Sequence, residues 1–313
     1  MALIGILICG LWLISGGCGP APGPPPPPSP KEAPPPEVRH WPYFRTPENL
    51  ILCGEAVPLD DPVVREDLDR EFTIVVWSRT QTTMWLKRAN RYFPEIEMKL
   101  RKKLLPLDLK YVVLVESDLR PKAKSPAGAL GFWQFILPTA QRFQLKTSDK
   151  VDERLEFGAS TDAALQYLQV LHRLFGNWAL ALAAYNCGEG RVQKEMTAQG
   201  VGSFYYLSLP EETERYVHRI LAAKIILEDP ARYGYDIPPD QLYPPLSYDE
   251  VEFTAAQEMP VKRLAEVCGT YYKAIKSLNP WIKTAALPPG SYRLKVPKGS
   301  GSRFQEAYRQ GRL

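Results

Sequence analysis

Between residues 65 and 228 the apolar side chains recur at helical spacing, and no stretch alternates apolar and polar residues as a strand does. Trp77, Trp85, Ala89 and Tyr92 form one such stripe, with intervals of eight, four and three residues. Only a helix turns every residue of such a stripe toward one core. The sequence therefore predicts a mainly α fold with an all-helical body.

Proline residues divide this body. Pro94 is predicted to break or restart the first helix, because its ring cannot donate a backbone hydrogen bond. Pro106 is predicted to open the next helix, which runs to about Glu116. Further helices are predicted at Trp133–Phe143, 160–175, Trp178–Tyr185 and Glu212–Glu228.

The pattern changes after residue 230. Residues 231–247 are rich in Pro and Tyr and are predicted to be a linker. The next fifty residues read as a strand, two helices and a strand, which predicts a small α+β module of βααβ order at 248–298. Residues 299–313 carry no clear signal. The elements predicted for the module are a strand at Tyr248–Thr254, helices at Val261–Cys268 and Tyr271–Leu278, and a strand at Ser291–Pro297.

The first 17 residues are almost wholly apolar and uncharged, and small residues directly precede Cys18. This pattern resembles a bacterial lipoprotein signal at residues 1–18, which predicts a lipidated Cys18 and attachment to a membrane. Gly19 after the cysteine favours the periplasmic face of the outer membrane within the cell envelope. An uncleaved signal anchor and a plain secretory signal are the alternatives.

A tether is predicted after this signal. Eleven of the 31 prolines lie between Pro20 and Pro36, so residues 19–37 are predicted to be extended and semi-rigid. Residues 38–105 would then be an N-terminal helical lead-in to the rest of the body.

Charge and ligand-type residues exclude several classes of function. The net charge of +4 is mild, and the chain shows no basic run with interleaved aromatics, so no nucleic-acid partner is predicted. The three histidines and the cysteines follow no ligand spacing, so neither a metal nor a cofactor is predicted. A disulfide from Cys53 to Cys187 or Cys268 stays open.

Glu116 closes the apolar run that begins at Tyr111. A carboxyl group at the edge of an apolar layer is poorly solvated, which raises its pKa and keeps it protonated near neutrality, as a general acid requires. The alternative is a helix-end glutamate with an ordinary surface hydrogen bond. Asp118 lies two residues further on, so it is expected to point elsewhere and to be solvated or to cap the helix.

Four motifs in order resemble the catalytic domain of lytic transglycosylases in the lysozyme superfamily, nearest to the membrane-bound lytic murein transglycosylase D type. The resemblance places a catalytic domain at residues 106–230. The motifs are Glu116-Ser117; Ser125 to Ala129 running into Gly131-Phe132-Trp133-Gln134; Ala183 to Gly188; and Leu209 to Thr213 with Tyr216.

The resemblance implies a peptidoglycan-cleaving enzyme. It would break the β-1,4 bond between N-acetylmuramic acid and N-acetylglucosamine and leave a 1,6-anhydromuramoyl end. Glu116 would act first as acid and then as base, while the N-acetyl group of the substrate supports the positive centre. The catalytic residues implied are Glu116, Ser125 and Tyr185, and the substrate-binding residues are Gln134, Asn186, Glu212 and Tyr216. The resemblance also implies that the Tyr185 hydroxyl lies beside Glu116, and that Glu212 and Tyr216 brace the opposite side of the site.

The C-terminal module resembles a LysM peptidoglycan-binding repeat, on Lys262 to Ala265, Ile275 to Asn279 and Pro289 to Pro297. Peptidoglycan glycan strands are therefore the expected partner, and a monomer is expected. Two other functions stay open: a peptidoglycan-binding lipoprotein without activity, and a hydrolase similar to goose-type lysozymes.

Overall fold

The computed structural model describes residue 23 and residues 42–313 of the chain. The predicted signal with Cys18, and the predicted tether apart from Gly23, lie outside these residues. All the helices and strands belong to one unit, Phe44–Leu313. Among the described residues, no helix has the length and apolar character needed to cross a membrane.

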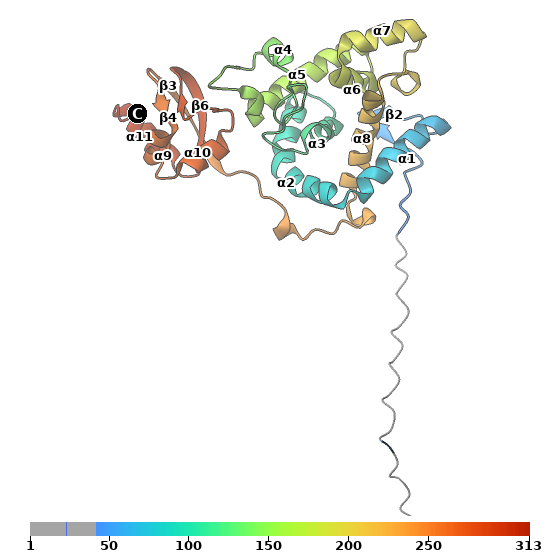
Figure 1. Cartoon of the computed structure of the whole chain (residues 1–313), viewed down its shortest axis with the longest axis horizontal. Helices are drawn as coiled ribbons and strands as arrows, with labels where there is room; N and C mark the ends of the chain where they lie inside the picture. The colour runs from blue at the N-terminus through green and yellow to red at the C-terminus, as the bar shows by residue number, and fades with distance from the viewer. Residues whose placement is uncertain (1–22, 24–41) are drawn as a thin grey trace, which may run out of the picture. The chain divides into compact units, whose positions relative to one another are not determined.

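The body is mainly helical, as predicted (Figure 1). A short antiparallel hairpin, which was not predicted, precedes the helices. The elements of the body are β1 (Ile51–Leu52), β2 (Glu55–Ala56), α1 (Pro62–Trp77), α2 (Arg79–Lys102), α3 (Val112–Ser117), α4 (Leu137–Arg142), α5 (Phe157–Phe175), α6 (Trp178–Cys187), α7 (Glu189–Gln199) and α8 (Glu211–Glu228). Short 3₁₀ helices lie at Leu107–Tyr111, Glu153–Leu155, Phe204–Tyr206, Ala231–Tyr233 and Pro239–Gln241.

Helix α6 lies at the centre of the body. Every residue from Trp178 to Ala184 is buried, and α5, α7 and α8 pack against the helix. A helix that is apolar all round can be stable only when protein surrounds it. This burial fixes α6, and its C-terminal end brings Tyr185 and Asn186 to the surface of the body.

Two predictions about the helices were wrong, and one helix was missed. Pro94 does not break α2, because buried side chains on both sides of it, among them Tyr92 and Ile96, hold the helix together. Packing of that kind can offset the ~3 kcal/mol cost of an internal proline. The helix predicted from Trp133 begins only at Leu137, after a left-handed residue at Gln134. Helix α7 was not predicted.

The predicted linker is also partly wrong. Tyr233 and Tyr235 are buried in the core of the body, and the Tyr235 hydroxyl donates a hydrogen bond of 2.7 Å to the carbonyl of Val76. This part of the segment therefore belongs to the body. The possible disulfides are absent from the described residues, since Cys53, Cys187 and Cys268 are free thiols.

The C-terminal module has the predicted βααβ order. Strands β3 and β6 pair antiparallel from Tyr248 with Pro297 to Ala255 with Gly290. The module also contains a second small strand pair and a final helix, which was not predicted because its apolar positions are few. Its elements are β3 (Tyr248–Ala255), β4 (Met259–Pro260), α9 (Val261–Val267), α10 (Tyr272–Leu278), β5 (Ala286–Leu287), β6 (Gly290–Pro297) and α11 (Gly301–Arg309).

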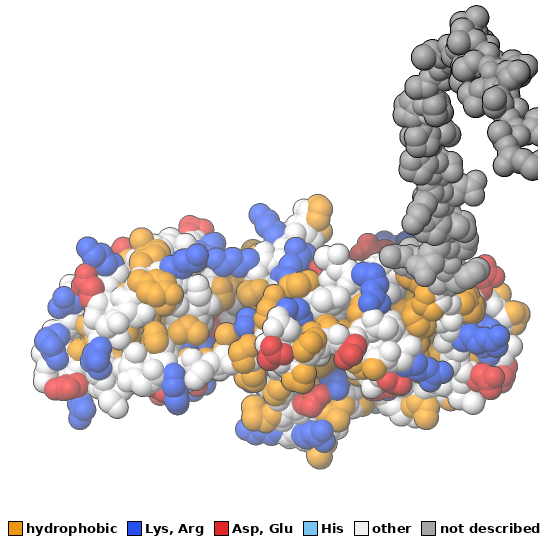
Figure 2. All heavy atoms as spheres, turned by 90° about the horizontal axis from the view of Figure 1, so that it is seen from below, with side chains coloured by type: hydrophobic (Ala, Val, Ile, Leu, Met, Phe, Trp, Pro, Cys, Tyr) orange, Lys and Arg blue, Asp and Glu red, His pale blue; other side chains and the backbone are white. Residues whose placement is uncertain are grey.

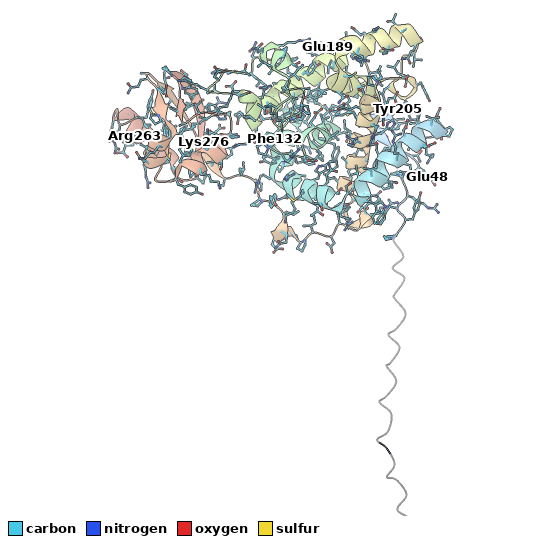
Figure 3. The ribbon with its side chains drawn as sticks, viewed as in Figure 1. Glu48, Phe132, Glu189, Tyr205, Arg263 and Lys276 are labelled. Atoms are coloured by element: carbon cyan, nitrogen blue, oxygen red, sulfur yellow. The ribbon has the colours of Figure 1, made fainter. Side chains whose placement is uncertain are left out.

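The body and the module each have a core of their own, and side chains fill the interior of both (Figure 3). Val151 and Leu155, from the loop before α5, belong to the module core. The surface mixes charges: Figure 2 shows Lys and Arg side chains scattered among acidic ones over the face drawn.

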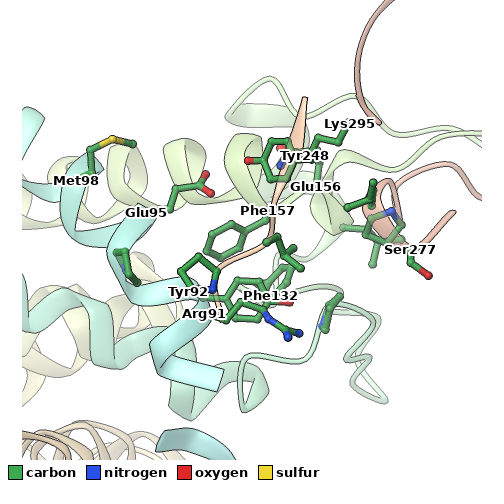
Figure 4. Close-up of a pocket in the computed structure, with 17 residues that line it drawn as sticks. Arg91, Tyr92, Glu95, Met98, Phe132, Glu156, Phe157, Tyr248, Ser277 and Lys295 are labelled. Carbon is green, nitrogen blue, oxygen red and sulfur yellow. Dashed lines mark hydrogen bonds and ion pairs between the residues drawn. The ribbon is translucent and has the colours of Figure 1, made fainter. Parts of the chain in front are cut away.

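An ion pair and a cavity mark the junction of body and module (Figure 4). The Lys295 ammonium of β6 lies 2.7 Å from the Glu156 carboxylate at the start of α5, and 4.9 Å from the centre of the Tyr248 ring. Burial alone would lower the pKa of Lys295, but the neighbouring negative groups, Glu156 first among them, outweigh it, so the pKa is raised and Lys295 stays charged. The cavity of about 330 Å³ beside it is lined in part by Phe132 and Phe157.

Helix α11 should be part of the module fold. Phe304 is fully buried and its ring packs edge-on against Phe253 of β3. We expect Phe304→Ala to lower the free energy of unfolding of the module by about 3–5 kcal/mol, because it leaves a cavity. Urea unfolding followed by circular dichroism measures this. The exposed Arg309→Ala is the control, and a loss no larger for Phe304→Ala than for this control would contradict the placement of α11 in the core.

Candidate active site

A cleft of about 730 Å³ lies on the body between the loop at 123–135 and the helices α3, α6 and α8. The structure brings together all seven site residues predicted for the domain, since each of them lines this cleft. They are Glu116, Ser125, Gln134, Tyr185, Asn186, Glu212 and Tyr216.

Helix α3 places Glu116 in the cleft. Val112, Val113 and Leu114 are fully buried in the core, so the short helix is fixed along its length. It ends at Ser117, because the next residue, Asp118, has a left-handed backbone with φ of 54°. Glu116 lies in the last turn and is half-buried, with its carboxyl group lining the cleft.

Asp118 points away from Glu116, as the spacing predicted. Its Oδ1 accepts hydrogen bonds from the Trp85 indole at 2.6 Å and from the Gln81 amide at 2.9 Å. Both donors belong to α2. Asp118 therefore ties α3 to α2 and takes no part in the cleft.

The carboxyl group of Glu116 has one hydrogen-bond donor among the described residues. The Tyr216 hydroxyl of α8 donates to its Oε1 at 2.5 Å. Burial raises the pKa of Glu116 to about 7; the Tyr216 bond lowers it and the Glu212 charge raises it by smaller amounts. Burial and the Glu116 charge hold the pKa of Tyr216 well above its usual range, so Tyr216 stays a donor.

Tyr185 and Tyr216 both line the cleft with Glu116, and it is Tyr216 that bonds its carboxyl group. The Tyr185 hydroxyl, predicted to lie beside Glu116, donates its hydrogen bond to the carbonyl of Trp133 at 2.8 Å and makes none to Glu116. Tyr185 still lines the cleft, and the Glu116 charge adds to burial in raising its pKa. The hydroxyl bonded to Glu116 is that of Tyr216, which the sequence placed on the opposite side of the site.

The loop at 123–135, here called the cleft loop, presents Ser125 and Gln134. The Ser125 hydroxyl oxygen accepts the backbone N–H of Ala129 at 3.1 Å, which leaves its hydrogen free to donate into the cleft. Gln134 has a left-handed backbone with φ of 48°, a conformation that costs about 1–3 kcal/mol for a residue with a side chain.

Two hydrogen bonds hold Gln134 in that conformation. Its amide nitrogen donates to the carbonyls of Gly131 at 2.8 Å and Ala123 at 3.1 Å. The amide oxygen accepts no bond from the described residues, so it can accept one from a ligand. Gln134 therefore both closes the loop and offers an acceptor.

The other predicted residues lie on α6 and α8. The Thr213 hydroxyl donates to Asn186 Oδ1 at 2.7 Å, which ties the end of α6 to the start of α8. Glu212 is exposed at the cleft rim. Besides Glu116 and Glu212, a third glutamate, Glu189 at the start of α7, lines the cleft. It was not predicted from the sequence, although it directly follows the third motif.

Glu189 differs from Glu116 in its partners. The Arg142 guanidinium donates to it at 2.6 Å and the Tyr167 hydroxyl at 2.9 Å. Burial alone would raise the pKa of Glu189, but these hydrogen bonds outweigh it and hold the pKa below its usual range. Glu189 is therefore ionised, whereas the pKa of Glu116 is raised.

Two parts of the chain match known families. Residues 93–206 match the transglycosylase SLT domain, and residues 251–312 match the LysM-like domain of lytic transglycosylase MltD. The first match includes Glu116, Ser125, Gln134, Tyr185 and Asn186 of the cleft. The second extends beyond the predicted module and includes α11.

The chain is also similar to individual proteins. It is 34% identical to membrane-bound lytic murein transglycosylase D of Escherichia coli K12 over 232 residues, which are 72% of this chain and 50% of that protein. It is 36% identical to the peptidoglycan transglycosylase gp16 of phage T7 over 116 residues, 36% of this chain and 9% of that protein. The chain thus spans about half the length of the first of these relatives.

A structural neighbour covers part of the chain. It is the soluble lytic transglycosylase SLT70 of Escherichia coli, with 25% identity and a TM-score of 0.40 over 55% of this chain and 29% of that one.

The raised pKa of Glu116 should make stability depend on pH. Between about pH 4.5 and 7 the folded protein keeps a proton that the unfolded chain releases, so stability falls as the pH rises through this window. We expect Glu116→Gln to exceed the wild type in free energy of unfolding by roughly 2–3 kcal/mol at pH 8, and to match it at pH 4. Urea unfolding at both values tests this, and an equal difference at the two would contradict the raised pKa.

Proposed function

Because residues 93–206 are a transglycosylase SLT domain, we propose that this chain is a peptidoglycan lytic transglycosylase. It cleaves the β-1,4 bond between N-acetylmuramic acid and N-acetylglucosamine and forms a 1,6-anhydromuramoyl end. The observation that carries the proposal is the Glu116 carboxyl, which lines the cleft with a pKa raised to about 7 and a hydrogen bond from Tyr216.

In the first step Glu116 is the general acid. Its proton passes to the glycosidic oxygen, and the bond from that oxygen to C1 of the muramoyl residue breaks. The positive charge that develops at C1 is stabilised by the N-acetyl group of the same sugar. A pKa near 7 suits this step, because a large fraction of the molecules keep the proton at neutral pH and yet give it up readily.

In the second step the Glu116 carboxylate is the general base. It takes the proton of the C6 hydroxyl, and O6 forms a bond to C1. The glutamic acid is restored, and no water is consumed. Tyr216 supports this step, since its hydroxyl donates to the carboxylate while that charge exists and cannot itself ionise near neutral pH.

The remaining residues bind the sugar. The hydroxyl of Ser125 donates to the acetamido group, because its own oxygen already accepts the Ala129 amide. The free oxygen of Gln134 accepts from a sugar hydroxyl. Tyr185, Asn186 and Glu212 line the cleft beside them and complete the sugar-binding surface.

The place of action follows from the sequence. We propose a cell-envelope protein, held at the periplasmic face of the outer membrane by a lipid on Cys18, with peptidoglycan glycan strands as its partner. The relative's description as membrane-bound and the LysM-like module support this place. The monomeric state stays a prediction from the sequence.

Replacing the acid should abolish cleavage. We expect Glu116→Gln to release products from purified peptidoglycan at least 10³-fold more slowly, because the amide can neither give nor take the proton. Glu195→Gln on α7, outside the cleft, should keep wild-type rates. Mass spectrometry of the wild-type digest should show anhydro ends, which lack one water. Hydrolysed ends would indicate a hydrolase, and equal release by Glu116→Gln would indicate a function without this acid.

The Tyr216 hydroxyl should set the pH range of activity. Its hydrogen bond lowers the pKa of Glu116, so Tyr216→Phe should raise this pKa further. We expect the alkaline fall in kcat/KM, near pH 7 in the wild type, to move to higher pH, with kcat at least tenfold lower. Rates of product release from pH 5 to 9 measure both. A fall that stays in place would show that Tyr216 does not bond the titrating group.

A further inference from the structure

The segment 146–156 belongs to the body in sequence, but its backbone pairs with the module. The Asp152 N–H donates to the Trp281 carbonyl at 2.9 Å, and the Lys283 N–H donates to the Lys150 carbonyl at 2.9 Å. Val151 forms an antiparallel bridge with Ile282, and its side chain is 9% exposed within the module core. The module therefore holds this segment by main-chain bonds and by packing.

The same segment holds the cleft loop through one guanidinium. Arg154 Nη1 donates to the carbonyls of Gly128 at 3.2 Å and Phe135 at 3.1 Å. Its other nitrogens bind the Asp152 carboxylate, Nε at 2.9 Å and Nη2 at 2.7 Å. The Arg154 and Asp152 side chains are 11% and 4% exposed, so little water competes for the pair between them, which fixes the guanidinium.

Two further contacts press the cleft loop against this side. Gly131 has φ of 83°, and a Cβ built on it would lie 2.0 Å from the carbonyl oxygen of Arg154. Only glycine allows this approach of the two backbones. Leu130 packs against the module core. The loop thus rests on Arg154 and on the module together.

The loop held in this way carries two cleft residues. Gly128 lies between Ser125 and Ala129, whose mutual hydrogen bonds orient the Ser125 hydroxyl. Phe135 directly follows the strained Gln134. A movement of either carbonyl away from Arg154 would therefore displace a group that faces the cleft.

We propose that Arg154 is a positioning residue, through which the C-terminal module sets the geometry of Ser125 and Gln134 in the cleft. The module then acts on turnover through a rigid connection, whether or not it also binds glycan. This inference rests on the proposed function, because it gives those two residues a part in the reaction.

The test is Arg154→Lys in the full chain. A lysine keeps the positive charge beside Asp152, but its single nitrogen cannot also hold both carbonyls. We expect kcat to fall roughly tenfold or more with less than a threefold change in KM, since small displacements of reacting groups act on turnover. Amide exchange at Leu130 and Gly131, which bond Phe135 and Ala123, should become at least tenfold faster.

Two further variants complete the test. Arg293→Lys, in an exposed pair with Glu252 on the module, should match the wild type in both measurements. Val151→Ala loosens the segment from the module core and leaves Arg154 intact. It should also speed exchange at Leu130 and Gly131 and lower kcat, and it serves in place of Arg154→Lys if that variant does not fold.

Unchanged exchange in the cleft loop would overturn the proposal, and so would faster exchange with wild-type kcat. A wild-type chain that releases no product contradicts the proposed function itself. A wild type that cleaves, beside an Arg154→Lys variant that cleaves equally fast, contradicts only the positioning role.

Discussion

The hydrogen bond from the Tyr216 hydroxyl to Glu116 joins two helices that are 100 residues apart in the sequence. Helix α3 brings a carboxyl group out of an apolar core, and α8 brings the hydroxyl that donates to it. A carboxylate in this place is poorly solvated, so the group keeps its proton to about pH 7. Any change in the spacing of α3 and α8 would alter that balance, and the rest of the body serves to keep it.

Buried charge helps to hold α8 in place. The Glu71 carboxylate of α1 is fully buried and bonds Arg215 at 2.6 Å and Arg219 at 3.0 Å, both on α8. Removing one partner from such a group costs about 3–5 kcal/mol, because a buried charge is left uncompensated. Tyr216 lies next to Arg215 in the sequence, so the ion pairs position the residue that bonds Glu116. Asp118 does the same for α3 through its bonds to α2.

Much of the fold could be predicted because apolar spacing reports directly on burial. The long helices and the βααβ module follow from it. The gathering of the motif residues in one cleft was predicted instead from the resemblance of the four motifs to a known family. The prediction that Pro94 breaks α2 was wrong, because the packing of the whole helix outweighs the local cost of one proline. The hydrogen-bond donor to Glu116 could not be assigned, since Tyr185 and Tyr216 both lie nearby and only tertiary geometry decides. Arg154 gave no signal, because its partners are backbone carbonyls.

The central claim is that one carboxyl group, kept protonated by its surroundings, supplies both proton transfers. It is tested most directly by titrating Glu116 itself, using carbon-13 NMR of the side-chain carboxyl and the Glu116→Gln variant for assignment. The account predicts a midpoint near pH 7 for this residue. A midpoint near 4.5, the value of an ordinary glutamate, would leave Glu116 ionised at neutral pH and would contradict it.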